Sequence, residues 1–418
     1  MRLIPTFLRP RRSCKLLALM GSVLLVMATL ASAVWLNGSS DGKSNVTNAA
    51  MAAQPQPTTI TLGTTVVFGY NDLGMHCLDE DFSEMMILPP YNILHATVID
   101  RGSDPKIVTS GVTVSYSIPS NTHSADKTNF WTHAQALLGV NLAPNIGLTG
   151  NGLSGAMVAT GTDEWVATGI PITPIDDSGR ENPFPLSLIT VGRNGQVVAR
   201  TQTVVPSSWE MNCNLCHNAP GISVATDILR THDNLHGTDL EHQKPVRCSK
   251  CHADPALGQP GVPGVKTLSH AMHGSHAPRM AQANLPVPCY ACHPGLRTKC
   301  LRDVHSSKGM NCMSCHGQVT DVANPTRRPW VDQPRCGDCH TRTGYDFEQA
   351  NTLYKDSKGH HGVPCAVCHG SPHAITPTTT AADNTQAIAI QGHSGPIDTC
   401  TVCHVQTPDG PFDHRAND

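Results

Sequence analysis

Residues 364–374 read PCAVCHGSPHA, and in them Cys365, Cys368 and His369 form the pattern CxxCH. The pattern occurs seven times, always after residue 209, with successive copies 23 to 41 residues apart. The copies are Cys213/Cys216/His217, Cys248/Cys251/His252, Cys289/Cys292/His293, Cys312/Cys315/His316, Cys336/Cys339/His340, Cys365/Cys368/His369 and Cys400/Cys403/His404. The uneven spacing differs from the fixed period of a solenoid repeat.

The CxxCH pattern is typical of covalent attachment of c-type haem. Its two thiols add across the haem vinyl groups, and the histidine that follows binds the iron. Zinc sites also use CxxC pairs, but they need a second pair and rarely a histidine at the next position. A disulfide framework would leave the seven histidines unexplained. We therefore predict seven covalent c-type haems, attached through the fourteen motif cysteines, with the seven motif histidines as iron ligands.

The second axial ligand of each haem has to come from elsewhere in the chain. Twelve further histidines lie after residue 209: His232, His236, His242, His270, His273, His276, His305, His360, His361, His373, His393 and His414. We predict that seven of them complete the iron sites: His232, His236, His273, His305, His361, His373 and His393. Methionine is the alternative sixth ligand and would raise the reduction potential; Met272, Met280 and Met310 are the candidates.

The first 57 residues contain two segments without globular character. Residues 1–33 have a basic start and an apolar run that ends in Ala31-Ser32-Ala33, a pattern typical of a cleaved signal peptide. The apolar run of 16–33 is also near the length needed to cross a bilayer, so an uncleaved anchor is the alternative. Residues 34–57 are small and polar, as expected of a flexible linker. Export agrees with haem attachment to CxxCH, which takes place outside the cytoplasm.

Residues 58–208 contain no CxxCH motif and have a β pattern. Runs rich in Val, Ile and Thr lie at 59–68, 93–99, 107–118, 165–175 and 186–205. Asn194-Gly195 indicates a hairpin turn in the last run, and 130–138 suits one short helix. The fold class that we predict is a β-rich N-terminal domain, a β-sandwich, followed over 209–418 by a mostly irregular, short-helix multihaem cytochrome c domain.

The region 209–418 resembles the multihaem c-type cytochromes of metal- and mineral-respiring bacteria, including those of outer surfaces and extracellular filaments. The resemblance depends on the seven CxxCH motifs and on segments such as CHGSPHA at 368–374. The stretch NDLGMHCLDED at 71–81 is similar, less specifically, to the haem-free N-terminal part of some of these proteins. The resemblance implies electron transport in the periplasm, on the outer surface or outside the cell.

Several functional readings compete on this sequence. A haem with two protein ligands has no position for a substrate, so we expect electron transfer and no enzymatic activity. Expected partners are other redox proteins or an extracellular electron acceptor, with self-association into filaments as a further possibility. The formal net charge of −3 gives no sign of nucleic-acid binding. The alternatives are a multihaem reductase, which needs one open haem, and an adhesive surface protein, which would leave the haems unexplained.

Two cysteines between the linker and the C-terminus lie outside the motifs, Cys77 and Cys300. In an oxidising compartment they either form a disulfide that joins the two regions or remain separate buried thiols. His76, beside Cys77, is a further candidate iron ligand.

The number of motifs makes a direct prediction about haem load. We expect the denatured protein to carry a mass excess of seven haem units, because thioether bonds survive denaturation. Mass spectrometry of the intact chain measures this excess. A count of five or fewer would contradict the use of every motif.

Overall fold

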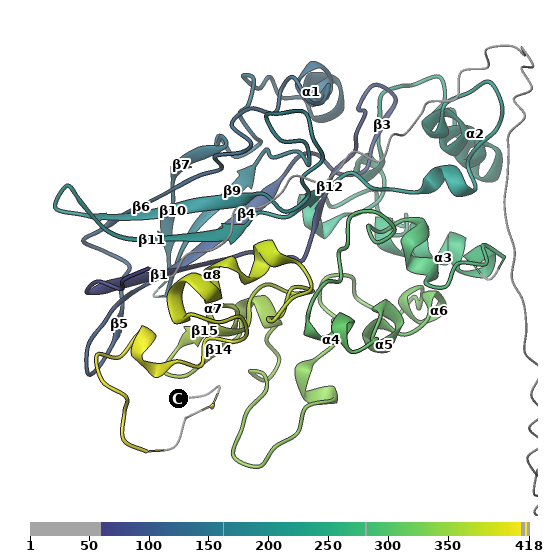
Figure 1. Cartoon of the computed structure of the whole chain (residues 1–418). Helices are drawn as coiled ribbons and strands as arrows, with labels where there is room; N and C mark the ends of the chain where they lie inside the picture. The colour runs from purple at the N-terminus through teal and green to yellow at the C-terminus, as the bar shows by residue number, and fades with distance from the viewer. Residues whose placement is uncertain (1–59, 162, 281, 411–413, 416–418) are drawn as a thin grey trace, which may run out of the picture. The chain divides into compact units, whose positions relative to one another are not determined.

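The part of the chain before residue 209 forms two antiparallel sheets (Figure 1). The first has the order β1-β4-β9-β8, with β5 paired to β4, and the second has the order β11-β10-β6-β7. The strands of the first are β1 (Thr65–Tyr70), β4 (Asn92–Asp100), β5 (Lys106–Ile107), β8 (Val158–Thr160) and β9 (Glu164–Ile170). Those of the second are β6 (Thr113–Ser117), β7 (Ser154–Ala156), β10 (Leu186–Arg193) and β11 (Gln196–Val204).

The computed structural model describes residues 60–161, 163–280, 282–410, 414 and 415. The predicted signal peptide (1–33) and linker (34–57) lie outside these residues. No helix in the described ranges is long and apolar enough to cross a membrane.

The two sheets share one apolar core. Val67 and Leu94 from the first sheet pack in one cluster with Tyr116 and Ile189 from the second, and all four are nearly inaccessible to solvent. In β6 the exposed and buried positions alternate, as expected where only one face of a strand points into the core. This arrangement confirms the predicted β-sandwich.

Two local elements agree closely with the sequence. Asn194 and Gly195 have φ of 52° and 77°, which is the conformation of a type I′ turn, and they join β10 to β11. The predicted helix is α1 (Phe130–Leu138), which ends at Gly139 with φ of 74°. Both depend on residues that tolerate or favour a particular backbone conformation, so the sequence specifies them locally.

Strand β1 is buried on both faces. Its Val67 points into the sandwich core, whereas Val66, Phe68 and Tyr70 pack against Val367 and other apolar residues of the C-terminal region. In Figure 1 the helices α7 (Cys365–His369) and α8 (Ala381–Gln391) lie alongside β1 and β11. The β region therefore supplies a surface on which the last part of the chain folds.

After residue 209 the chain consists of short helices and turns, as predicted. The other α-helices are α2 (Val224–His236), α3 (Leu268–Met280), α4 (Val304–Ser307), α5 (Cys312–His316) and α6 (Val319–Val322). The 3-10 helices are Cys213–Leu215, Cys248–Lys250, Pro255–Leu257, Pro288–Ala291, Cys336–Asp338, Tyr354–Asp356 and Cys400–Val402. Short strand pairs are β12 (Ser207–Ser208) with β2 (His76–Cys77), β13 (Val246–Arg247) with β3 (Met85–Met86), and β14 (Lys358–Gly359) with β15 (Val363–Pro364).

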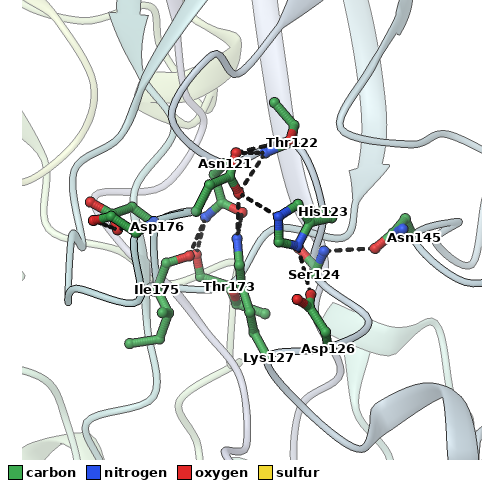
Figure 2. Close-up of polar contacts among 12 residues, drawn as sticks. Asn121, Thr122, His123, Ser124, Asp126, Lys127, Asn145, Thr173, Ile175 and Asp176 are labelled. Atoms are coloured by element: carbon green, nitrogen blue, oxygen red, sulfur yellow. Dashed lines mark hydrogen bonds and ion pairs between the residues drawn. The ribbon is translucent and has the colours of Figure 1, made fainter.

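A polar network fixes the loops at one end of the sandwich (Figure 2). The Asn121 amide donates to the carbonyls of Thr173 and Ile175 at 2.7 and 2.9 Å. The Lys127 ammonium donates to the Asn121 side chain at 2.9 Å and to Asp177 at 2.7 Å. Because each donor has an acceptor, the buried amide of Asn121 carries little desolvation penalty.

The largest fully buried side chain among the described residues is that of Arg302. Its guanidinium makes two hydrogen bonds to Asp383, at 2.6 and 2.8 Å, and donates to the carbonyl of Gly74 at 2.5 Å. It also lies 4.6 Å from the centre of the Phe184 ring. One cation thus joins helix α8, the β region and the segment between the third and fourth CxxCH motifs.

Replacing Arg302 by Met should strongly destabilise the protein, because Asp383 would remain buried without its cation. Breaking one partner of a buried pair costs about 3–5 kcal/mol. The measurement is the free energy of unfolding in denaturant. Arg328→Met is the matched control, since the Arg328–Asp332 pair is exposed and such pairs contribute little. Equal effects of the two substitutions would contradict a structural role for Arg302.

Candidate haem-binding sites

Each CxxCH motif forms a single helical turn, and we number the sites 1 to 7 in chain order. In five of them a hydrogen bond of 2.8 to 3.1 Å runs from the histidine N–H to the carbonyl of the first cysteine. The other two are the helices α5 and α7, whose bounds coincide with the motif. A single turn brings the two thiols and the imidazole of a motif close together, as attachment and ligation of one haem require.

The motif cysteines differ in how far they are exposed to solvent. The second cysteine of the motif is exposed at sites 1, 2, 4 and 5, namely at Cys216, Cys251, Cys315 and Cys339, and the remaining motif cysteines are half-buried. A thiol that adds across a vinyl group has to be accessible to the porphyrin, so the exposure of these four cysteines is compatible with attachment of haem. Attachment of haem through Cys251 and Cys339, as through the other motif cysteines, stays a prediction.

Every motif histidine faces a second histidine from elsewhere in the chain. The seven ring-centroid distances lie between 5.9 and 6.4 Å. In order of site, the pairs are His217–His276, His252–His232, His293–His273, His316–His373, His340–His305, His369–His414 and His404–His360.

These distances match two imidazoles bound to one metal ion from opposite sides. With a metal–nitrogen bond of about 2 Å and about 1.1 Å from that nitrogen to the ring centre, the centroids would be roughly 6 Å apart. The pair His232–His236, which contains no motif histidine, lies closer, at 4.8 Å. The residues present therefore fit haem iron held between paired histidines.

The facing histidines are oriented through their Nδ1 atoms. On α3, His273 donates from Nδ1 to the Ser269 carbonyl at 2.8 Å, and His276 does the same to the Met272 carbonyl at 2.7 Å. His414 donates to the carbonyl of Asp346 at 2.8 Å, and the Asp303 carboxylate accepts from His305 at 2.9 Å. A bond at Nδ1 leaves the Nε2 lone pair for a metal, which is the usual arrangement of ligating histidines.

Burial keeps several of these rings in the neutral form that binds metal. It lowers the pKa of His293 and of His373 to about 4. It also lowers the pKa of five other members of the pairs: His217, His232, His273, His316 and His369. A neutral imidazole has the free lone pair that ligation needs.

The site 4 partner, His373, depends on a close approach by the β region. Its backbone has φ of 59°, which is uncommon for a residue with a side chain. Gly74 lies against it: a Cβ at Gly74 would fall 2.4 Å from the His373 Cβ and 2.5 Å from the Pro372 carbonyl oxygen. The glycine of the NDLGMHC stretch thus gives room for a candidate ligand.

Four of the seven predicted second ligands face a motif histidine, namely His232, His273, His305 and His373. Three predicted residues lie elsewhere. His236 lies beside His232, His361 beside His360, and His393 is exposed near Asp398. The positions facing sites 1, 6 and 7 are held by His276, His414 and His360.

The three facing histidines outside the predicted set differ in how far the sequence indicates them. His276 follows His273 by three residues on one helix, a spacing that places both on neighbouring positions of its surface. His360 adjoins the predicted His361, so only the backbone conformation distinguishes them. His414 lies 45 residues after His369 in the chain, and no local signal links the two.

Residues 76, 77 and 300 lie where the β region meets the haem-motif region. The buried His76 has Nδ1 2.9 Å from the Tyr91 carbonyl oxygen and Nε2 2.8 Å from the Asn71 side-chain oxygen, so neither nitrogen points to a site. Cys77 and Cys300 pack in one apolar cluster and are not bonded to each other. Burial raises the pKa of both thiols, that of Cys300 to about 11. In this structure they are separate thiols, which is one of the two alternatives that the sequence left open.

Comparison with known families gives a match within the haem-motif region. Residues 320–370 are similar to the family described as cytochrome c554 and c-prime. This segment contains the motifs of sites 5 and 6, and the similarity implies c-type haem and haem-based electron transfer. Comparison with curated proteins and with solved structures gave no match.

Replacing Gly74 by Ala should disturb site 4 specifically, because the new methyl group would collide with His373. Overpacking of this kind costs about 1–3 kcal/mol, and we expect a change in the absorption spectrum equivalent to one haem. Gly63→Ala is the control, since its Cβ would meet only the Val198 carbonyl oxygen at 3.7 Å. An unchanged spectrum and an unchanged free energy of unfolding in Gly74→Ala would show that the loop carrying Gly74 can move away from His373 without disturbing site 4.

Proposed function

We propose that this chain is an exported electron carrier that binds seven c-type haems and conducts electrons between them. The observation that carries the proposal is the set of seven opposed histidine pairs, one at every CxxCH motif. The similarity of residues 320–370 to a cytochrome family supports the same conclusion. When bound, each haem would supply reversible one-electron exchange at its iron.

In this proposal the fourteen motif cysteines hold the haems and each histidine pair provides both axial ligands. The second ligands at sites 1 to 7 are His276, His232, His273, His373, His305, His414 and His360. Two neutral imidazoles lack the thioether that raises the potential of a His/Met site, so low potentials are expected. The chain's task is to fix the rings and to hold the sites close together.

The competing function is a multihaem reductase with one open haem. Such an enzyme needs a site where no protein group occupies the second axial position. At all seven motifs a histidine occupies the facing position at the distance of a ligand, and this favours a carrier over a catalyst. The same pairing favours histidine over Met272, Met280 or Met310 as the second ligand.

The location and partners follow from the haem chemistry. Attachment of haem to CxxCH outside the cytoplasm, together with the apolar run in 1–33, supports a periplasmic, outer-surface or extracellular site. Partners would be other redox proteins or an extracellular acceptor. Self-association into filaments stays a prediction, and the pairs give no requirement for it, because each facing histidine comes from the same chain.

Replacing a facing histidine by alanine should open one haem. In His276→Ala we expect one of seven haems to become high-spin and to bind carbon monoxide, because site 1 loses an axial ligand. His236→Ala is the matched control and should leave all seven low-spin. Electron paramagnetic resonance and carbon monoxide difference spectra measure the change. A stoichiometric high-spin haem in the unmodified protein would favour the reductase instead.

A second pair of variants tests the facing position at site 6. His414→Ala should open one haem, whereas His393→Ala should not, although His393 lies closer in sequence to a motif. Opening of a haem in His393→Ala alone would mean that haem binding rearranges the segment around α8.

A further inference from the structure

We propose that the seven sites form one line in the order 2-1-3-4-5-6-7, so that site 1 is internal and site 2 is an end. The inference rests on the proposed function and adds to it the path that electrons take. Chain order would instead place site 2 between sites 1 and 3. Contacts between neighbouring sites decide between the two orders.

Sites 1 and 3 are in direct contact. The Asn212 side chain, next to the first motif, donates to the carbonyl of Tyr290 within the third motif at 2.9 Å. The buried carboxylate of Glu210 accepts hydrogen bonds from backbone N–H groups at 295–298, just after the third motif. Helix α3 carries the facing histidines of both sites, His276 and His273, three residues apart.

Site 2 is attached to site 1 through α2. In the first turn of this helix the Asp227 carboxylate lies 4.0 Å from Nδ1 of His217, the motif histidine of site 1. His232, five residues further on, faces the motif histidine of site 2. Five residues of helix span about 7.5 Å, so α2 holds these two sites next to each other.

Site 2 is also linked to site 3 through α3. Next to the site 2 motif, the Ala253 carbonyl accepts from the N–H of Leu268, the first residue of α3, at 3.0 Å. The site 3 histidine on α3, His273, follows Leu268 by five residues, or about 7.5 Å of helix, which equals the separation across α2. The two orders are therefore distinguished by the direct contact between the segments of sites 1 and 3, which allows electrons to pass between these sites without site 2.

Sites 3 to 5 follow one another without interruption. The side chains of Cys289 and Cys312, the first cysteines of sites 3 and 4, lie close enough to interact with each other. Sites 4 and 5 are joined by the segment 302–305. Its Arg302 N–H donates to the carbonyl of His373 at 3.0 Å, and its His305 faces the motif histidine of site 5.

Sites 5 to 7 continue the line. The ring of Phe347 lies 5.5 Å from that of His340 at site 5 and 5.8 Å from that of His414 at site 6. Cys368 of site 6 and Cys403 of site 7 pack against the same apolar cluster beneath β1. Each site from 3 onward thus has the next site in the chain as its neighbour, and only the first two exchange places.

The test uses the full, haem-loaded chain with thiol contacts at the two proposed ends. Leu235→Cys lies on α2 beside site 2 and Val405→Cys follows the site 7 motif; both positions are more than half exposed. Single-molecule conductance is measured between the two thiols. Adding Cys213→Ala and Cys216→Ala removes site 1, and we expect conductance to fall at least tenfold because site 2 loses its neighbour.

Chain order predicts the opposite, since site 1 would lie outside the path from site 2 to site 7. Unchanged conductance would therefore overturn the proposal. Removal of site 3 by Cys289→Ala and Cys292→Ala lowers conductance in either order and serves as the positive control. Intact mass must show six haems in each variant and seven in the parent. A parent with fewer haems or no conductance would contradict the proposed function rather than the order.

A variant that fails to load six haems is replaced by a direct measurement on the unmodified protein. Electron microscopy or crystallography of the loaded chain gives the iron positions. The proposal expects the iron of site 1 to be the nearest neighbour of site 2. An iron of site 2 nearer to that of site 3 than to that of site 1 would overturn it.

Discussion

Two imidazoles that bind one iron from opposite sides must have their ring centres about 6 Å apart and a nitrogen of each ring directed at the iron. The CxxCH turn provides one ring of each pair, because the histidine is fixed to the same helical turn as both thiols. The other ring is not positioned by a sequence motif of this kind. It is held by a hydrogen bond at Nδ1, as at His273 and His414, or by an uncommon backbone conformation, as at His373.

The difference between the ring in the CxxCH turn and the ring from a distant segment also explains which features the sequence could predict. The turn at Asn194-Gly195 and the helix α1 are determined by local conformational preferences, and the CxxCH motifs by local chemistry. The second ligands depend on tertiary structure. His393 belongs to the predicted set, but it lies exposed beside Asp398, and His360 lies opposite the motif histidine of site 7. His414 reaches site 6 only because its segment returns to residue 346.

The β region does more than form its own core. Strand β1 reads TVVFGY, a nearly continuous apolar run of the kind found in strands buried on both faces, and β1 is buried on both. Its second face packs against the motifs of sites 6 and 7, while Gly74 makes room for His373 and its carbonyl accepts from Arg302. These contacts explain how a chain with 4% aromatic residues can order its C-terminal half. The sandwich provides an apolar surface against which the short helices of the C-terminal region pack.

Neighbouring sites share helices and short segments of chain, and this sharing restricts how far the sites can move apart. The rate of transfer falls steeply with distance, so a conducting protein has to keep its cofactors from moving apart. Helix α3 carries the facing histidines of two sites, separated by three residues, or about 4.5 Å of rise. Helix α2 and the segment 302–305 join two sites in the same way. Because a helix is stiffer than a loop, the spacing between these sites is set by backbone geometry. The region after residue 209, which consists of short helices and turns, can therefore still hold its sites at fixed separations.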